Sequence, residues 1–189
     1  MRNLAPLLVL ALLAIPCAAF GQALSAYNQP PPCQAEQDFS RKAEAIIAEE
    51  INAARAKGMP DAPALHPDAQ LTRIAELRAC ELARAGKLTH LDDRGHQQAA
   101  DIVFSVFAPY GLVGENLMRM KAAREPLNAE TFAASAAELW LKSPQHRQHI
   151  LDPRYDQSGI GVAMVNGEAV ATQVFHGPPA RPHGSTGSP

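Results

Sequence analysis

Apolar residues recur at helical spacing in two long segments in the first half of the chain. In the first segment they repeat from Phe39 to Ala54, and Gly58 follows the last turn. In the second, Pro67 suits a first-turn position, the spacing continues, and Gly86 marks the end. The pattern predicts two amphipathic helices, with the residues after Gly86 in a loop.

Shorter periodic segments follow. Residues 95–110 are predicted to form a short helix that breaks at Pro109. A further helix is predicted from Asn128 to Trp140. Directly after it, Ser143-Pro144 provides a capping residue and a first-turn proline, which predicts another short helix.

The clearest β pattern lies near the C-terminal end. Apolar residues alternate with small ones from Ile160 to Met164 and again from Val170 to Val174, and Asn166-Gly167 supplies a two-residue turn between them. This predicts a β-hairpin. Helices around a small antiparallel sheet make an α+β layered domain the expected fold class.

The first residues are typical of a secretory signal peptide: a charge at Arg2, an apolar run from Leu4 to Phe20, and small residues up to Ala23. Pro6 and Pro16 interrupt the run, which argues against a membrane anchor, because spanning a bilayer takes about 20 apolar residues. We predict a leader over residues 1–23 and a secreted or periplasmic mature protein without a transmembrane segment.

The rest of the chain divides by composition. Residues 24–35 are predicted to form a proline-rich arm, 36–177 a single domain, and 178–189 a disordered tail rich in Pro, Gly and Ser. The 17 Lys and Arg are balanced by 19 Asp and Glu, and no basic run adjoins aromatic residues. Nucleic-acid binding is therefore not expected.

Cys17 leaves with the leader, so the exported chain keeps Cys33 and Cys80. An even pair in an oxidising compartment favours a disulfide. The bond would close a loop of about 48 residues and stabilise the fold by about 3 to 4 kcal/mol through loop entropy. Two free thiols, one of them buried, are the alternative, and thiol titration of the unfolded, unreduced protein distinguishes the two.

Candidate chemistry comes from three short strings that contain His90, Glu115 and His146. Neutral imidazoles and a carboxylate suit a divalent cation such as zinc, whose catalytic sites commonly use three protein ligands. The same residues also have structural interpretations. His90 can hold backbone groups of its loop, and His149, three residues after His146, can cap the end of its helix. Glu115 lies among apolar residues and needs a partner if it is buried, for which His90 is the candidate.

Nucleophilic hydrolysis has weaker support. Ser143 is better explained as a helix cap and Ser158 as a turn residue, and the chain has no Gly-x-Ser-x-Gly motif. No serine-hydrolase site is predicted.

Several strings together resemble the CAP superfamily, which contains cysteine-rich secretory proteins, antigen five and plant pathogenesis-related proteins, and in particular its bacterial, SCP-like extracellular branch. Their order and spacing carry the resemblance, which covers about residues 36–175. The strings are Ile51-Asn52-Ala53-Ala54-Arg55, Leu88-Thr89-His90, Gly114-Glu115-Asn116-Leu117, Trp140 with Ser143-Pro144-Gln145-His146-Arg147, and Ala171-Thr172-Gln173-Val174-Phe175.

The resemblance implies a three-layer α-β-α sandwich with a small, mainly antiparallel sheet flanked by helices. It also implies a central cavity in which family members place two His and two Glu, sometimes around a divalent cation. His90 and Glu115 match the first His and the first Glu.

The match to the cavity residues is partial. Where the animal and plant pattern has a second His, this chain has Val170 and Ala171, and where that pattern has a second Glu it has Ser143. Like bacterial relatives it carries His146 instead, and Glu138 is a loose substitute for the missing acid. A cation is therefore expected to bind weakly.

The resemblance does not select one activity, since members of the family are lipid or sterol binders, secreted signalling or defence proteins, and occasionally proteases. We interpret the chain as a non-enzymatic binding module whose cleft can hold a zinc or magnesium ion, with Asn116, Glu138 and Ser143 supporting the cavity. A metal-dependent hydrolase of peptides or esters and an extracellular lipid or sterol binder are the alternatives. The expected partner is an extracellular small molecule, lipid or protein.

Overall fold

The structure is a computed structural model that describes residues 33, 37–107, 111–122 and 127–179. The expected leader, the expected arm apart from Cys33, the break at Pro109 and the tail from residue 180 onward lie outside the described residues.

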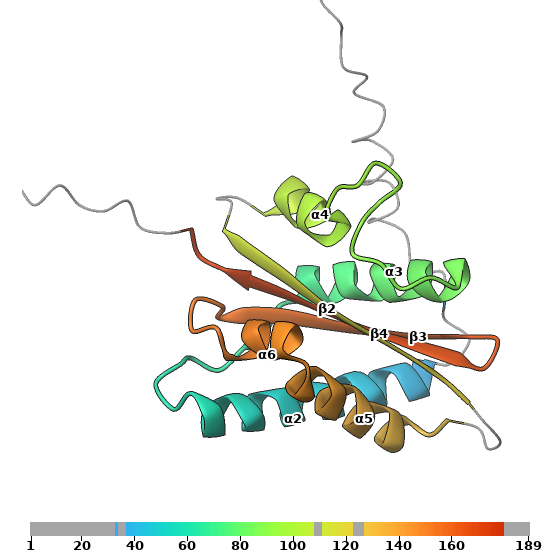
Figure 1. Cartoon of the computed structure of the whole chain (residues 1–189), viewed down its shortest axis with the longest axis horizontal. Helices are drawn as coiled ribbons and strands as arrows, with labels where there is room; N and C mark the ends of the chain where they lie inside the picture. Colours follow the sequence, from blue (N-terminus) through green and yellow to red (C-terminus); the bar gives the residue numbers. More distant parts are fainter. Residues whose placement is uncertain (1–32, 34–36, 108–110, 123–126, 180–189) are drawn as a thin grey trace, which may run out of the picture.

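A mixed sheet with strand order β1-β3-β4-β2 forms the central layer of the domain. Helices α3 and α4 cover one face, and α2, α5 and α6 cover the other (Figure 1). The expected three-layer α-β-α sandwich is confirmed. Its elements are α2 (Gln37–Gly58), β1 (His66–Pro67), α3 (Ala69–Ala85), α4 (Gln98–Val106), β2 (Leu112–Lys121), α5 (Ala129–Lys142), α6 (Pro144–Leu151), β3 (Gln157–Val165) and β4 (Glu168–Gly177).

Helix α3 begins later than the sequence pattern predicts. Pro67 belongs to the short strand β1, where it pairs with Ser158. Asp68 is the N-cap, because its Oδ1 accepts hydrogen bonds from the backbone N–H groups of Gln70 at 2.8 Å and Leu71 at 2.9 Å. The predicted first-turn role of Pro67 is therefore wrong.

The predicted hairpin is confirmed as β3 and β4. Asn166 and Gly167 have φ angles of 54° and 73°, the left-handed conformation that a two-residue hairpin turn requires. Strand β2 has no counterpart among the predicted elements. It pairs antiparallel with the outer side of β4, with Glu115 opposite Val174, and becomes an edge of the sheet.

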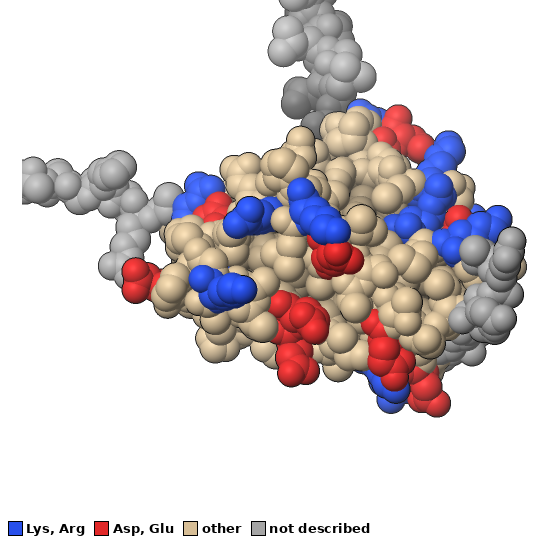
Figure 2. Space-filling view, turned by 60° about the horizontal axis from the view of Figure 1, so that its bottom comes forward, with Lys and Arg blue, Asp and Glu red and all other residues tan. Residues whose placement is uncertain are grey.

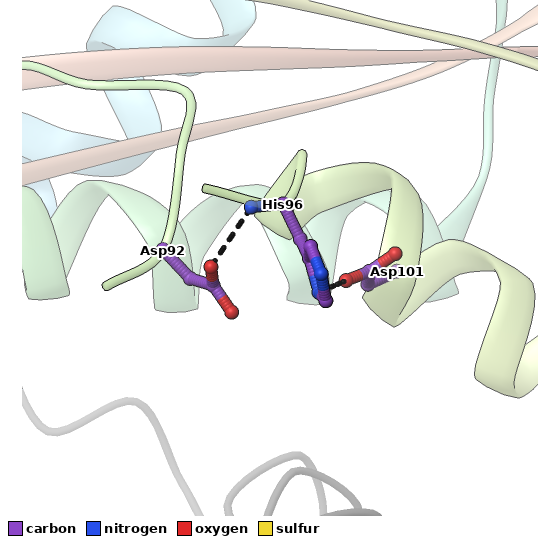
Figure 3. Close-up of side chains that lie close together, drawn as sticks. All are labelled: Asp92, His96 and Asp101. Atoms are coloured by element: carbon purple, nitrogen blue, oxygen red, sulfur yellow. Dashed lines mark hydrogen bonds and ion pairs between the residues drawn. The ribbon is translucent and has the colours of Figure 1, made fainter. Parts of the chain in front are cut away.

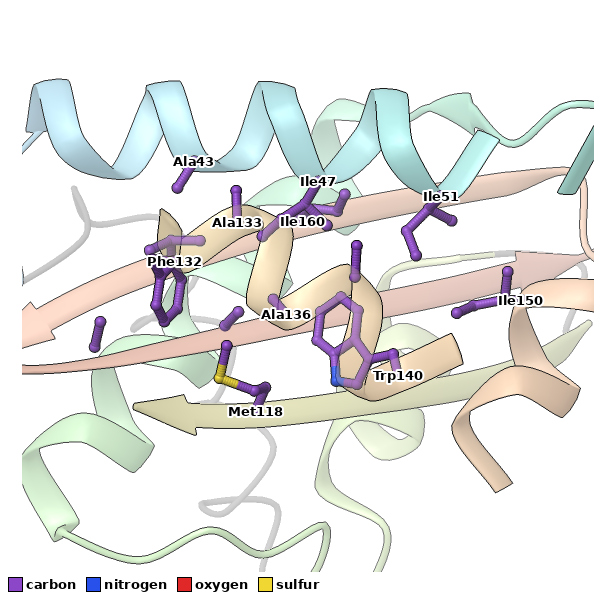
Figure 4. Close-up of a cluster of buried hydrophobic side chains, with 14 of the residues drawn as sticks. Ala43, Ile47, Ile51, Met118, Phe132, Ala133, Ala136, Trp140, Ile150 and Ile160 are labelled. Carbon is purple, nitrogen blue, oxygen red and sulfur yellow. The ribbon is translucent and has the colours of Figure 1, made fainter. Parts of the chain in front are cut away.

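The main hydrophobic core lies between the sheet and the helices α2 and α5 (Figure 4). Ile47 and Ile51 of α2 meet Phe132 and Trp140 of α5, and each of these side chains is at most 1% exposed. The Trp140 indole also donates a hydrogen bond of 3.0 Å to the backbone oxygen of Leu117 on β2. The core therefore fixes α5 against both α2 and the sheet edge.

On the opposite face, α3 packs on the sheet and carries the disulfide. Cys33 and Cys80 are bonded, with their Cα atoms 5.6 Å apart, which confirms the expected pairing. The bond fixes the start of the described chain to the middle of α3.

Arg55, at the end of α2, is a buried connector between distant loops. It is 1% exposed and donates hydrogen bonds to four backbone oxygens. The acceptors are Pro63 at 2.6 Å, Ile150 at 2.6 Å, Asp152 at 2.9 Å and Tyr155 at 2.6 Å. One guanidinium thus satisfies carbonyl groups in the last turn of α6, in the loop after α6 and in the loop after α2.

Gly161→Ala is expected to lower the free energy of unfolding by about 1 to 3 kcal/mol, the usual effect of overpacking. A Cβ at this position of β3 would lie 2.1 Å from the backbone N of Glu76 and 2.2 Å from the backbone C of Ala75. Backbone atoms of α3 cannot rotate away, so the helix would have to shift. Equilibrium urea unfolding measures the effect.

Gly58→Ala is the matched control for this substitution. Its added Cβ would meet only the side chain of Leu151, at 3.1 Å, and that side chain can rotate. Equal losses for the two variants would contradict the close packing of α3 on β3.

Charges are mixed on the face of the molecule drawn in Figure 2, where Lys and Arg are interspersed with Asp and Glu. This agrees with the balanced composition. Within the described ranges, no helix is long and apolar enough to cross a membrane.

Candidate functional site

The candidate site is built around Glu115, which lies on the edge strand β2 and is 6% exposed. Both carboxylate oxygens have partners. Oε1 accepts a hydrogen bond of 3.1 Å from Nε of Arg78, and Oε2 lies 2.8 Å from Nδ1 of His90. The acid thus lies in a strand, and it has His90 as its expected partner.

Arg78 of α3 holds this carboxylate, and sequence reasoning missed it. The side chain is 1% exposed, and its remaining donors bond to Glu81 at 3.0 Å, to Gln98 at 2.7 Å and to the backbone oxygen of Thr89 at 2.8 Å. It therefore joins α3, the loop before His90, α4 and β2. A signal was present, since Arg78 falls on the stripe of α3 that is otherwise apolar, between Ala75, Ala79 and Leu82.

His90 lies in the loop between α3 and α4, and its backbone oxygen accepts a bond of 3.0 Å from the N–H of Gln98. The side chain is 39% exposed. An ionised carboxylate only accepts, so the contact with Glu115 assigns the imidazole proton to Nδ1. Nε2 has no hydrogen-bond partner among the described residues and is left with a free lone pair.

Helix α6 brings two more imidazoles to the same region. Burial lowers the pKa of His146, and the nearby imidazoles of His90 and His149 lower it further. The pKa of His149 is also lowered, first by burial and then by His90, although Asp152 and the backbone of Glu115 oppose this shift. Both side chains are therefore neutral at neutral pH, the form in which an imidazole can bind a metal.

Asn116 fixes α6 against β2. Its side-chain nitrogen donates to the backbone oxygen of His146 at 3.1 Å, and its oxygen lies 2.9 Å from Nδ1 of His149. The fully buried amide thus commits one nitrogen of His149 and positions the helix that carries His146. The predicted supporting role of Asn116 is consistent with these contacts and stays a prediction.

The other two residues predicted to support the cavity lie differently. Glu138 is exposed on α5 and its carboxylate pairs with Lys142, so the structure does not bring it to Glu115. Ser143 is the N-cap residue of α6, but its side chain makes no capping bond to the helix backbone and instead donates to Oε1 of Gln145 at 3.4 Å.

The arrangement at β2 fits a cation through imidazole nitrogens rather than through the carboxylate. Glu115 is held by Arg78 and His90, so its main effect is to orient the His90 ring, as carboxylates commonly do behind metal-bound histidines. Nε2 of His90 and the neutral ring of His146 are the donors that could hold an ion. Two such ligands would leave most coordination positions to water or to a ligand.

A second group of possible ligands lies in the loop before α4 and in the first turn of that helix (Figure 3). One ligand atom from each of Asp92, His96 and Asp101 lies within 4.8 Å of the others. Oδ1 of Asp92 is already bonded to the backbone N–H groups of Arg94 and His96, and Nδ1 of His96 lies 3.5 Å from Asp101. These contacts explain the loop conformation without an ion, and sequence reasoning did not select this group.

Comparisons with known proteins agree with the fold. An outer surface protein of Borrelia burgdorferi has a TM-score of 0.60 at 18% identity, with coverage of 72% of this chain and 92% of its own. An extracellular protein with an SCP domain from Bacillus anthracis has a TM-score of 0.56 at 20% identity, with coverage of 78% of this chain and 44% of its own. A cysteine-rich secretory protein of Staphylococcus aureus has a TM-score of 0.51 at 17% identity, covering 76% and 40%. The chain thus spans less than half the length of the last two.

At these identities the structural similarity shows the fold alone. No curated protein sequence matches the chain significantly. The sequence model of the cysteine-rich secretory protein family, however, matches residues 48–175. This range contains both layers of helices and most of the sheet. The chain therefore belongs to the cysteine-rich secretory protein (CAP) family.

Proposed function

We propose that the chain is an exported, non-enzymatic binding domain whose cleft at His90 and Glu115 holds a divalent cation weakly. The observation that carries this proposal is the engagement of both Glu115 oxygens, one by Arg78 and one by His90. With both oxygens bonded to side chains of this chain, the carboxylate has no oxygen free of protein partners. It serves to orient His90 rather than to act as a base.

The His90 ring then keeps Nε2 without a hydrogen-bond partner among the described residues, and His146 supplies a second neutral nitrogen. A bound zinc or magnesium ion would polarise an oxygen of the ligand as a Lewis acid. The chain's own contribution is to fix the direction of the two rings, through Glu115 for His90 and through Asn116 for the helix that carries His146. The cation and its remaining ligands would come from the extracellular medium.

Export is part of the proposal. The leader pattern of residues 1–23 and the bond between Cys33 and Cys80 support it, since disulfides persist in oxidising compartments.

A metal-dependent hydrolase is the second candidate. It is favoured by the neutral imidazoles of His146 and His149, which could accept a proton from a bound water. Against it, the serines considered as nucleophiles are placed for structure, with Ser143 bonded to Gln145 and Ser158 buried beside Gln173. No contact among the described residues favours a lipid or sterol binder.

Zinc titration by calorimetry tests the proposal. His90→Ala and His146→Ala are each expected to weaken zinc binding by about tenfold or more, because each removes one ligand of a site with few protein donors. His96→Ala is the matched control, since it removes the imidazole of the exposed loop group and should leave the affinity unchanged.

Loss of binding in His96→Ala alone would contradict the proposal and assign the ion to the loop before α4. Hydrolysis of peptide and ester panels is followed in parallel with the same variants. Zinc-dependent turnover that disappears in His90→Ala would replace the binding function with the hydrolase. Urea unfolding of each variant confirms that the domain remains folded.

A further inference from the structure

A hollow of about 310 Å³ lies at the other edge of the sheet, between α2 and β3. It is separate from the candidate site, because β3 and β2 are on opposite sides of β4 in the strand order. This volume is within the range of small-molecule pockets, about 300 to 1,000 Å³. We call it the α2–β3 hollow, and its lining includes Glu44, Ala48, Ile51, Ser158, Ile160 and Gln173.

Gln173 of β4 lines the hollow and has a side-chain oxygen without a hydrogen-bond partner. Its side chain is 1% exposed, and its nitrogen donates to Oγ of Ser158 at 3.5 Å. Its oxygen, Oε1, is buried without a hydrogen-bond partner. A buried carbonyl oxygen without a hydrogen bond destabilises the folded protein. A hydrogen-bond donor on a bound ligand would remove this free-energy cost.

Glu44 of α2 supplies a second acceptor. One oxygen accepts a bond of 2.9 Å from the backbone N–H of Val162 on β3, and within the described part of the chain the other has no hydrogen-bond partner. Burial raises the pKa of Glu44 to about 7, with a further increase from Glu76 of α3, while the Val162 bond and Arg41 oppose the shift. Arg41 also lines the hollow, but its Nη2 donates to Oε1 of Gln37 at 2.7 Å, and among the described residues it forms no ion pair with Glu44.

The hollow therefore has two free acceptors, one of them an acid, and apolar surface from Ala48, Ile51 and Ile160 between α2 and the sheet. A matching ligand carries a positive charge, a short aliphatic chain and a second hydrogen-bond donor. We propose that the α2–β3 hollow binds short aliphatic amines with a second donor, the ammonium group pairing with Glu44 and the other donor reaching Oε1 of Gln173. This inference is independent of the cation at His90.

Putrescine is the probe, and calorimetry with the full mature chain is the measurement. Butylamine lacks the second donor and butanediol lacks the charge, and each is expected to bind at least about tenfold more weakly than putrescine, the effect of one lost polar contact of this strength. Saturable binding of putrescine with this ranking supports the inference. The absence of saturable heat with any of the three would overturn it.

Two variants assign the contacts to residues. In Gln173→Met, putrescine should bind no better than butylamine, because the acceptor for the second donor is gone. In Glu44→Gln, putrescine and butanediol should bind equally. Glu49→Gln, an exposed acid on the same helix outside the lining of the hollow, should bind putrescine as the wild type does. Equal affinities in the wild type, Gln173→Met and Glu44→Gln would overturn the assignment.

The variants also report on folding. Gln173→Met removes an unpaired buried acceptor at nearly constant volume, so its urea midpoint should equal or exceed that of the wild type. Loss of binding in that variant cannot then come from unfolding. The affinity for putrescine should also rise as the pH passes about 7, where Glu44 ionises, and this pH dependence should disappear in Glu44→Gln.

Discussion

Replacing Arg78 with methionine is expected to lower the free energy of unfolding by about 3 to 5 kcal/mol, the usual loss when one partner of a buried ion pair is removed. The guanidinium is 1% exposed and bonds to Glu115, whose side chain is 5% exposed. Without it the carboxylate keeps only His90, and the backbone oxygen of Thr89 loses its donor. Equilibrium urea unfolding with linear extrapolation measures the loss.

Arg147→Met is the control, because Arg147 is exposed on α6 and should change stability by less than about 0.5 kcal/mol. Combining Arg78→Met with Glu115→Gln should recover part of the loss, since a neutral amide does not require a buried cation. If the double variant is no more stable than Arg78→Met alone, the pairing of the two charges is not the source of the effect.

Replacing Arg55 with methionine is expected to lower the free energy of unfolding by about 3 kcal/mol or more, because each of three carbonyls left without a donor costs about 1 kcal/mol at least. The backbone oxygens of Pro63, Ile150 and Tyr155 would lose their hydrogen bond from this side chain, whereas that of Asp152 keeps the N–H of Tyr155 at 3.2 Å. Their segments are far apart in sequence, so the loss should spread from the end of α2 to the loop after α6. Hydrogen exchange in residues 150–156 and urea unfolding measure the two effects.

Arg55→Lys tests whether the positive charge alone is sufficient or whether the planar guanidinium group is required. A single ammonium cannot reproduce the planar fork that reaches separate carbonyls, so it should recover less than half of the loss. Lys57→Met on the exposed side of the same helix is the control and should be nearly neutral. Full recovery by lysine would contradict the role assigned to the fork.

The parts of the fold that the sequence predicts are those whose physical causes are local. The hairpin follows from Asn166-Gly167, whose backbone angles match the turn, and the end of α3 follows from Gly86, whose φ is 60°. Strand β2 could not be predicted in this way. Glu115 and Asn116 are consecutive and both buried, so the strand shows no alternation of polar and apolar residues.

The candidate site was also predictable only in part, because its contacts join segments that are far apart in the sequence. His90 and Glu115 are found by their resemblance to a known pattern and lie in contact. Arg78, which determines the state of Glu115, looks in the sequence like one more charge on a helix, because its partners come from three other segments. Glu138 was selected by its position near a motif, and the geometry of α5 directs it to solvent beside Lys142.

The way in which α5 and α6 cover β2 has a consequence for self-association. The backbone oxygen of Leu117 is occupied by the Trp140 indole of α5, and the side chain of Asn116 on the same strand is bonded to His146 and His149 of α6. A bare edge of this kind would be a template for a strand from another molecule. Detachment of α6 alone should therefore leave part of this edge open to pairing with a strand of another molecule before the core unfolds.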